Sequence, residues 1–227
     1  MSVALPTVLV LTSVVAEPPI DNIGYICHVP LLSKYITKAR LSRVTQYLGN
    51  EICDIGCGNG ELVDYLPMNV HRLVMIDRSP NRRQFVEAQM AKKKINGQFV
   101  QADITSEAFC SSMEPFETVV IAALLEHLNS PKIAFKHIFN LLKPNGKIVI
   151  TTPSLMGGIV HSYASLLYLT NREAALEHHK FYNRRSLKQL LVQQGFVMEY
   201  YERFQVGLNQ IAVGRKLPKS DSLFRVV

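Results

Sequence analysis

The chain has 227 residues, of which 48% are hydrophobic and 19% charged, so it is long enough for one full α/β core or at most two small domains. The net charge of +7 favours an anionic partner such as nucleic acid, a phosphate group or an acidic lipid surface, but this support is weak because the basic residues are scattered and the one dense run is Lys92–Lys94. Four cysteines are too few for a disulfide framework, and no second Cys or His pair at zinc spacing accompanies Cys53 and Cys57, so we expect a reducing compartment and no metal site.

Residues 1–30 are expected to form a packed N-terminal arm. The opening, MSVALPTVLVLTSVVAEPP, is apolar, as in a signal peptide. A signal peptide, however, has Lys or Arg ahead of the apolar run and a small-x-small cleavage site after it, and this segment has neither. It is also too short to span a bilayer. A targeting or membrane role is the alternative, and the preferred prediction is a cytoplasmic protein without a transmembrane segment.

A helix is expected next, and after it strands and helices alternate along the chain. The helix is LLSKYITKARLSRVTQYLG, in which apolar residues lie near one face and Gly49 ends the element. The apolar runs expected to be strands are residues 52–55, 72–77, 97–104, 116–125 and 147–154. Near-continuous apolar strands of this kind, alternating with helices, indicate a mostly parallel, doubly wound sheet with helices on both faces, which is a three-layer α/β fold.

The turn residues between these strands give more local predictions. Ser79-Pro80 and Ser130-Pro131 each place an N-cap residue before a proline at the first helical position. KPNGK, residues 143–147, is expected to be a turn. Towards the C-terminus, SLKQLLVQQGF is a helix ending at Gly195, and FVMEYYERF and NQIAVGRK follow without an intervening helix, which predicts an antiparallel hairpin.

Three features gather at the expected carboxyl ends of the first three strands, where open α/β sheets bind ligands. They are the glycines Gly56, Gly58 and Gly60 after the first strand, Asp77 after the second, and Asp103 after the third. Glycines let a ligand approach the backbone closely because no Cβ intervenes. Asp77 lies about twenty residues past the first glycines, the spacing at which a carboxylate accepts hydrogen bonds from ribose hydroxyls.

The glycine run distinguishes between two nucleoside cofactors. A dinucleotide site has the pattern G-x-G-x-x-G, whereas here the sixth position is Glu61, whose charge would repel a pyrophosphate. A zwitterionic amino-acid tail carries an ammonium group that Asp54 and Glu61 would accept. The pattern therefore argues against NAD and for S-adenosylmethionine (SAM).

At this point the sequence resembles a known family, the class I SAM-dependent methyltransferases. DIGCGNG is similar to their glycine motif, VMIDRS to their ribose-binding loop, VQADI to their adenine-binding loop, FETVVIAALLEHLNSP to the segment around their fourth strand, and LLKPNGKIVITTPS to their fifth-strand signature. The similarity runs from about residue 52 to 152 and continues faintly to the terminal hairpin. It is strongest to small-molecule enzymes typified by ubiquinone-biosynthesis O-methyltransferases.

The resemblance implies a Rossmann-like, seven-stranded sheet with an antiparallel last strand. It implies a single SAM-dependent methyltransferase domain over residues 31–216, with a lid-like insert at about 155–177 and a C-terminal tail at 217–227. It also implies roles for particular residues: the backbone of Gly56, Cys57 and Gly58 faces the methionine moiety, Asp54 orders that loop, Asp77 holds the ribose with Arg78 beside the adenine, Asp103 bonds the adenine amino group, Ile104 packs on the ring, and Ala122 or Ala123 lines the site. Many relatives have a polar or acidic residue at one of the two alanines, and this chain departs from the family pattern there.

A hydroxyl acceptor needs a base near neutral pH, which histidine suits. The candidates are His127, which follows Glu126, and His178, which neighbours His179 before the last helix. The alternatives are a capping or packing role for His127 and a solvated loop for the His178–His179 pair. The apolar insert before them is a candidate lid; a homodimer surface or a cover for an apolar, lipid-like acceptor explains it equally well.

The sequence therefore predicts an enzyme that methylates a small molecule, at oxygen rather than nitrogen or carbon, with S-adenosylhomocysteine (SAH) as product. An RNA or protein methyltransferase is the second reading, suggested only by the basic charge. It is disfavoured because IAALLEH stands where amino-directed nucleic-acid enzymes have an Asn/Asp-Pro-Pro-aromatic signature. The third reading is a SAM-binding, non-catalytic partner subunit, which the paired alanines keep open, and a NAD-dependent dehydrogenase ranks below it.

Overall fold

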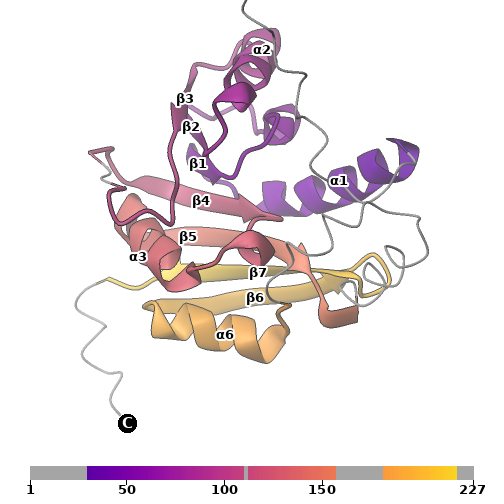
Figure 1. The fold of residues 1–227 in the computed structure, drawn as a ribbon, viewed down its shortest axis with the longest axis vertical. Coiled ribbons are helices and arrows are strands. Elements are labelled where there is room, and N and C mark those ends of the chain that lie inside the picture. The colour runs from indigo at the N-terminus through magenta and orange to yellow at the C-terminus, as the bar shows by residue number, and fades with distance from the viewer. Residues whose placement is uncertain (1–29, 110–111, 157–180, 219–227) are drawn as a thin grey trace, which may run out of the picture.

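A seven-stranded sheet forms the centre of the computed structural model, which describes residues 30–109, 112–156 and 181–218. The strand order is β3-β2-β1-β4-β5-β7-β6, and only β7 runs antiparallel to the others (Figure 1). The strands are β1 Glu51–Ile55, β2 Arg72–Asp77, β3 Gly97–Gln101, β4 Phe116–Ala122, β5 Leu142–Pro153, β6 Phe196–Phe204 and β7 Asn209–Lys216. This confirms the expected Rossmann-like fold and the terminal hairpin.

Helices cover both faces of the sheet, as the three-layer prediction required. The α-helices are α1 Pro30–Val44, α2 Arg83–Lys93, α3 Pro131–Leu141 and α6 Arg184–Gln193. On one face, Leu41 of α1 and Val86 of α2 pack into a core with Ile52 of β1. On the other face, Phe135 of α3 and Leu187 of α6 pack with the opposite side chains of the strands. The chain crosses from one half of the sheet to the other between β1 and β4, so the switch point for ligand binding lies at the end of β1.

The predicted helix start at Ser130-Pro131 is confirmed, whereas the one at Ser79-Pro80 is wrong in detail. Pro80 opens only a 3-10 turn, Pro80–Arg82, and α2 begins at Arg83, while Pro131 does begin α3. Neither Ser79 nor Ser130 makes a side-chain capping bond. Before α2 the Ser79 amide instead donates to the Asp77 carboxylate at 2.9 Å, so the last residue of β2 fixes the start of the turn.

Two other local predictions differ from the structure. The KPNGK segment lies inside β5, which continues through it with an irregular register opposite Phe116–Thr118 and with Asn145 at a φ of +64°. The last helix begins earlier than the apolar pattern indicated. Asn183 caps it, accepting from the Ser186 amide at 2.9 Å, while the Ser186 hydroxyl accepts from the Asn183 amide at 2.8 Å, a complete capping box.

Several expectations fall on parts of the chain outside the described residues. These are nearly all of the N-terminal arm, the insert from residue 157 onward, His178 and His179, and the tail from residue 219. Across the described ranges, no helix is long and apolar enough to cross a membrane.

Candidate active site

The three glycines of the loop after β1 all adopt the left-handed conformation. Their φ angles are +72° at Gly56, +54° at Gly58 and +83° at Gly60. A Cβ on Gly56 would lie 2.8 Å from the Leu124 side chain, and one on Gly60 would lie 3.2 Å from the backbone of Val86. A Cβ on Gly58 would meet only the Glu61 carboxylate, at 3.6 Å. Gly56 and Gly60 therefore allow close packing within the protein, whereas the space beside Gly58 is open to a ligand.

The amides of this loop are already engaged by β2. The Gly56 and Cys57 N–H groups both donate to the Ile76 carbonyl, at 2.8 and 3.2 Å, and the Gly58 N–H donates to Asp77 Oδ2 at 3.1 Å. The Cys57 side chain is buried, and burial raises the pKa of its thiol well above the ordinary value, so it stays a neutral packing group. Any ligand therefore meets the Cα and carbonyl surface of the loop beside a fixed carboxylate.

Replacing Gly58 and Gly56 by Ala is expected to separate ligand approach from folding. Each variant pays about 1–2 kcal/mol for a left-handed alanine, and Gly56→Ala also drives a methyl group into Leu124, which costs about 1 kcal/mol more. Gly58→Ala is therefore the more stable variant but the weaker ligand binder. Thermal unfolding and calorimetric titration with SAH measure both quantities, and equal ligand affinity in the two variants would contradict this assignment of the loop.

Asp77 ends β2 and lies beside the glycine loop at the carboxyl edge of the sheet. Its Oδ2 accepts from the Gly58 amide at 3.1 Å and its Oδ1 from the Ser79 amide at 2.9 Å. Each carboxylate oxygen has two lone pairs, so both can still accept a hydroxyl group. The carboxylate thus joins the glycine loop to the turn after β2, and it keeps lone pairs that can accept from the hydroxyl groups of the ribose expected there.

Asp103 and Ile104 follow β3 at the same edge. Asp103 Oδ1 accepts from the Thr105 amide at 2.8 Å and its hydroxyl at 2.6 Å, and these bonds, with a smaller effect from Arg78, lower the pKa of the Asp103 carboxyl. Asp103 is thus ionised and fixed, ready to accept from an amino group. Ile104 is 4% exposed and belongs to the core below, so little of its side chain is left to contact a ring.

Three acidic groups surround the glycine loop. Asp54 is the last but one residue of β1 and is 4% exposed, with Glu61 and Asp77 close enough to act on it electrostatically. Burial, with smaller contributions from those two negative charges, raises the pKa of the Asp54 carboxyl to about 8. A cationic ligand would relieve this repulsion, whereas a pyrophosphate would add to it. Within the described ranges, no three His, Cys, Asp or Glu side chains are grouped to hold a metal ion.

The end of β4 supplies the other half of the site. Ala122 is partly exposed, and Ala123 has a φ of +54°, held there by its N–H donating to the Thr151 carbonyl at 2.8 Å. The 3-10 turn Leu125–His127 follows, with His127 half-buried and Glu126 only 2% exposed. The Thr152 hydroxyl donates to Glu126 at 2.9 Å. Sequence reasoning treated Glu126 only as the neighbour of His127, and the pairing that buries it spans 26 residues, with no local pattern to indicate it.

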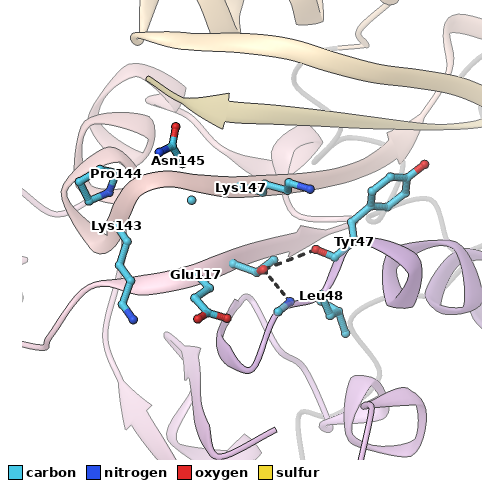
Figure 2. Close-up of a pocket in the computed structure, with 10 residues that line it drawn as sticks. Tyr47, Leu48, Glu117, Lys143, Pro144, Asn145 and Lys147 are labelled. Atoms are coloured by element: carbon cyan, nitrogen blue, oxygen red, sulfur yellow. Dashed lines mark hydrogen bonds between the residues drawn. The ribbon is translucent and has the colours of Figure 1, made fainter. Parts of the chain in front are cut away.

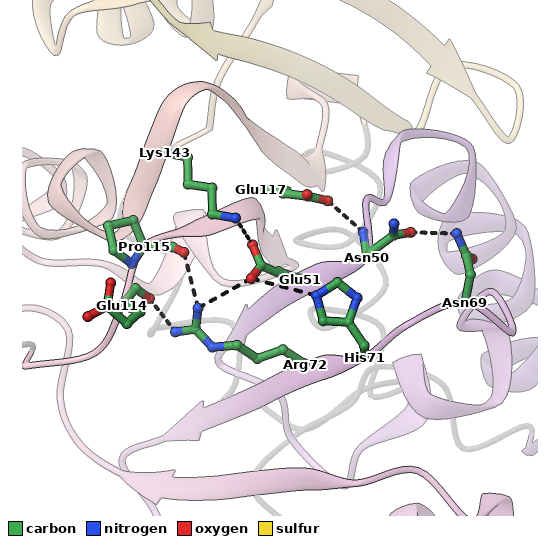
Figure 3. Close-up of polar contacts among 9 residues, drawn as sticks. All are labelled: Asn50, Glu51, Asn69, His71, Arg72, Glu114, Pro115, Glu117 and Lys143. Carbon is green, nitrogen blue, oxygen red and sulfur yellow. Dashed lines mark hydrogen bonds and ion pairs between the residues drawn. The ribbon is translucent and has the colours of Figure 1, made fainter.

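The opposite, amino-terminal edge of the sheet contains two cavities but no such convergence. A cavity of about 350 Å³ is lined by Lys143, Lys147 and Glu117, among others (Figure 2). A second, of about 440 Å³, is lined by Glu51 and Arg72, among others, and Figure 3 shows the polar contacts of these two residues. Glu51 is ion-paired with Lys143 and with Arg72 at 3.8 Å, and Lys143 lowers the pKa of the Glu51 carboxyl. These ion pairs tie the starts of β1, β2 and β5 together. The glycines and the carboxylates that converge lie at the carboxyl edge, which is therefore the candidate active site.

Known proteins resemble this chain in sequence and in fold. Residues 31–201 match a family model described as a methyltransferase domain. Curated relatives include the ubiquinone biosynthesis O-methyltransferases of Alkalilimnicola ehrlichii, 30% identical over 122 residues (52% of this chain, 49% of the relative), and of Pseudomonas fluorescens strain Pf0-1, 27% identical over 105 residues (46% and 44%). The chain thus spans about half the length of the curated relatives it matches. Among solved structures, a SAM-dependent methyltransferase from Methanosarcina mazei has a TM-score of 0.59 at 18% identity, over 78% of this chain and 98% of its own.

Proposed function

This chain belongs to the methyltransferase-domain family, and from that membership we propose that it transfers the methyl group of SAM to an oxygen atom of a small-molecule acceptor, releasing SAH. The resemblance to class I SAM-dependent methyltransferases that the motifs predicted is confirmed by the family match, and the cofactor is SAM. The observation that carries the proposal is the acid-lined glycine loop at the switch point, where Asp54 is buried with a raised pKa.

The residues present fit SAM on physical grounds. The buried Asp54 carboxyl, next to Glu61 and Asp77, favours a ligand with positive charge, and SAM carries an ammonium and a sulfonium. The side of Gly58 facing away from the protein is open to close approach. In this proposal Asp77 accepts from the ribose hydroxyls, Asp103 accepts from the adenine amino group, and the loop of Gly56, Cys57 and Gly58 lies against the methionine moiety.

The order of the strands then leaves one region for the acceptor. Adenine beside β3, ribose beside β2 and methionine beside β1 point the reactive end of the cofactor towards β4 and β5, the next strands in the sheet. When bound, SAM supplies an electrophilic methyl group, and the protein's tasks are to align the acceptor and exclude water. The turn Leu125–His127 lies at that end of β4. We assign His127 the role of base towards an acceptor hydroxyl, with His178 as the second candidate from the sequence.

Oxygen and a small molecule are preferred for two reasons. The curated relatives are O-methyltransferases of ubiquinone biosynthesis, although the match covers only about half of their length. The segment IAALLEH at the end of β4 also lacks the Asn/Asp-Pro-Pro-aromatic signature of amino-directed nucleic-acid enzymes. An apolar, lipid-like acceptor, a homodimer and a cytoplasmic location stay predictions.

A methyl-transfer screen tests the proposal. The protein is incubated with SAM labelled on the methyl group and with phenols and catechols, with amines and with RNA, and the label is located by mass spectrometry. Transfer to a phenolic oxygen is the expected result, and His127→Ala should reduce it while leaving SAM binding intact. Transfer only to RNA or to an amine nitrogen would contradict the proposed acceptor.

A further inference from the structure

Gln210 lies fully buried at the start of β7 and holds three segments together. Its side-chain Nε2 donates to the Tyr182 carbonyl at 2.7 Å and to the Pro153 carbonyl at 3.0 Å. Its Oε1 accepts from the Tyr201 hydroxyl of β6 at 2.9 Å. Both N–H donors and the carbonyl oxygen of one amide are therefore used to connect the end of β5, the segment before α6 and the edge strand. We call this arrangement the Gln210 clamp.

The clamp lies at the carboxyl edge of the sheet. Because β7 runs antiparallel to β5, the beginning of β7 faces the end of β5, and Gln210 is the ladder partner of Thr152. One residue beyond Pro153, Ser154 pairs with Tyr182 in an isolated parallel bridge. Ser154 is fixed further by its amide, which donates to the Leu208 carbonyl at 2.8 Å, and by its hydroxyl, which donates to Gly207 at 2.6 Å. The clamp thus sets where the Ser154–Tyr182 pair lies.

The same buried layer reaches the turn that contains His127. Thr152, beside Gln210 in the ladder, donates its hydroxyl to the buried Glu126 carboxylate at 2.9 Å. Burial raises the pKa of the Tyr182 phenol, and the negative charge of Glu126 adds to that effect. The two side chains are therefore close enough to interact electrostatically. Polar groups that are buried and mutually satisfied adopt one arrangement, because breaking any of the bonds leaves an unpaired group.

We propose that Gln210 is a positioning residue for the acceptor: the clamp fixes the buried Ser154–Tyr182 pair and Thr152 against Glu126, and so sets the position of the partly exposed His127, beside which a small hydroxyl-bearing acceptor rests. This inference rests on the proposed function, because it assumes that the acceptor binds beside β4 and β5. The cofactor half of the site, on β1 to β3, shares no hydrogen bond with the clamp among those described.

Two pairs of variants test it. Gln210→Leu removes all three bonds, and Gln210→Glu keeps the shape but loses both donors. Within the clamp, Tyr201→Phe removes only the bond to Oε1, together with an exposed bond that the Tyr201 hydroxyl accepts from Arg203 at 3.1 Å. It is the milder variant if the others do not fold. Tyr200→Phe is the matched control, because its hydroxyl bonds Glu202 at 2.9 Å on the exposed surface and does not touch the clamp.

The expected results separate positioning from general damage. The clamp variants should raise the acceptor KM by about fivefold or more, while their SAH affinity stays within twofold of wild type. They should also speed hydrogen exchange of the Ser154 amide. Tyr200→Phe should change neither the acceptor KM nor the exchange. Unchanged Ser154 exchange would overturn the clamp itself. Faster exchange with an unchanged acceptor KM would overturn its positioning role. Absence of SAM binding or methyl transfer in the wild type would instead overturn the proposed function, which the exchange measurement does not depend on.

Discussion

Replacing Asp77 by Ala is expected to weaken SAM binding by about 1–3 kcal/mol, which is about 5- to 150-fold in Kd. The substitution removes the acceptor for the ribose hydroxyls and releases the Gly58 amide, which Asp77 Oδ2 holds at 3.1 Å. Asp77→Asn keeps one oxygen and should lose less. Calorimetric titration with SAM and SAH measures the effect.

The matched control for Asp77 is Asp64→Ala. Asp64 is about as exposed as its ion-pair partner Lys93, at 41% and 42% of the side chain, and it lies outside the glycine loop. Its removal should leave SAM affinity within twofold of wild type. If Asp77→Ala binds SAM as tightly as this control does, Asp77 does not contact the ribose.

Binding of SAH is expected to strengthen steeply as the pH rises towards 8. Below the raised pKa of Asp54, about 8, the carboxyl is protonated in the free protein, and a ligand whose ammonium group prefers the carboxylate must displace that proton. The affinity should therefore rise by up to about tenfold per pH unit between about pH 6 and 8 and level off above. Asp54→Asn should bind more weakly at pH 8 and show no such slope. A flat profile in the wild type would remove Asp54 from the ligand site.

The same raised pKa predicts how the stability of the free protein changes with pH. Because the folded-state pKa lies above the ordinary value of 3.8, Asp54 contributes stability that is fully present below pH 3.8 and is lost as the pH rises to about 8. Asn imitates the protonated form, so Asp54→Asn should unfold at a higher temperature than wild type at high pH. The difference should disappear in acid, which thermal unfolding across this range measures.

The sheet was predictable from sequence because strands such as β2 and β4 are nearly continuous in apolar residues and turn signals separate the strands. The helix starts were less predictable, since a capping residue type does not determine which bond its side chain forms. Ser79 illustrates this, because its amide is held by Asp77 while its hydroxyl does not cap the turn. Conversely, Asn183 and Ser186 form a full capping box that was hidden in a polar stretch before the apolar pattern.

Some residues of the candidate site were likewise predictable from sequence, and others were not. Asp54, Asp77 and Asp103 were found from sequence because they stand at or next to the carboxyl ends of successive strands, where position alone brings them to one edge. The buried layer of Glu126, Thr152 and Gln210 was not found. Its members belong to β5, β7 and the turn after β4, and they meet only because of the strand order β4-β5-β7, which no local pattern of residues reports.

Isothermal titration of the full chain with SAM, SAH and NADH tests the central claim most directly. The account predicts that SAM and SAH each bind at one site per chain and that NADH does not bind, because the acid-lined loop with Glu61 at its sixth position accepts an ammonium group and repels a pyrophosphate. Binding of NADH without binding of either sulfur ligand would contradict it.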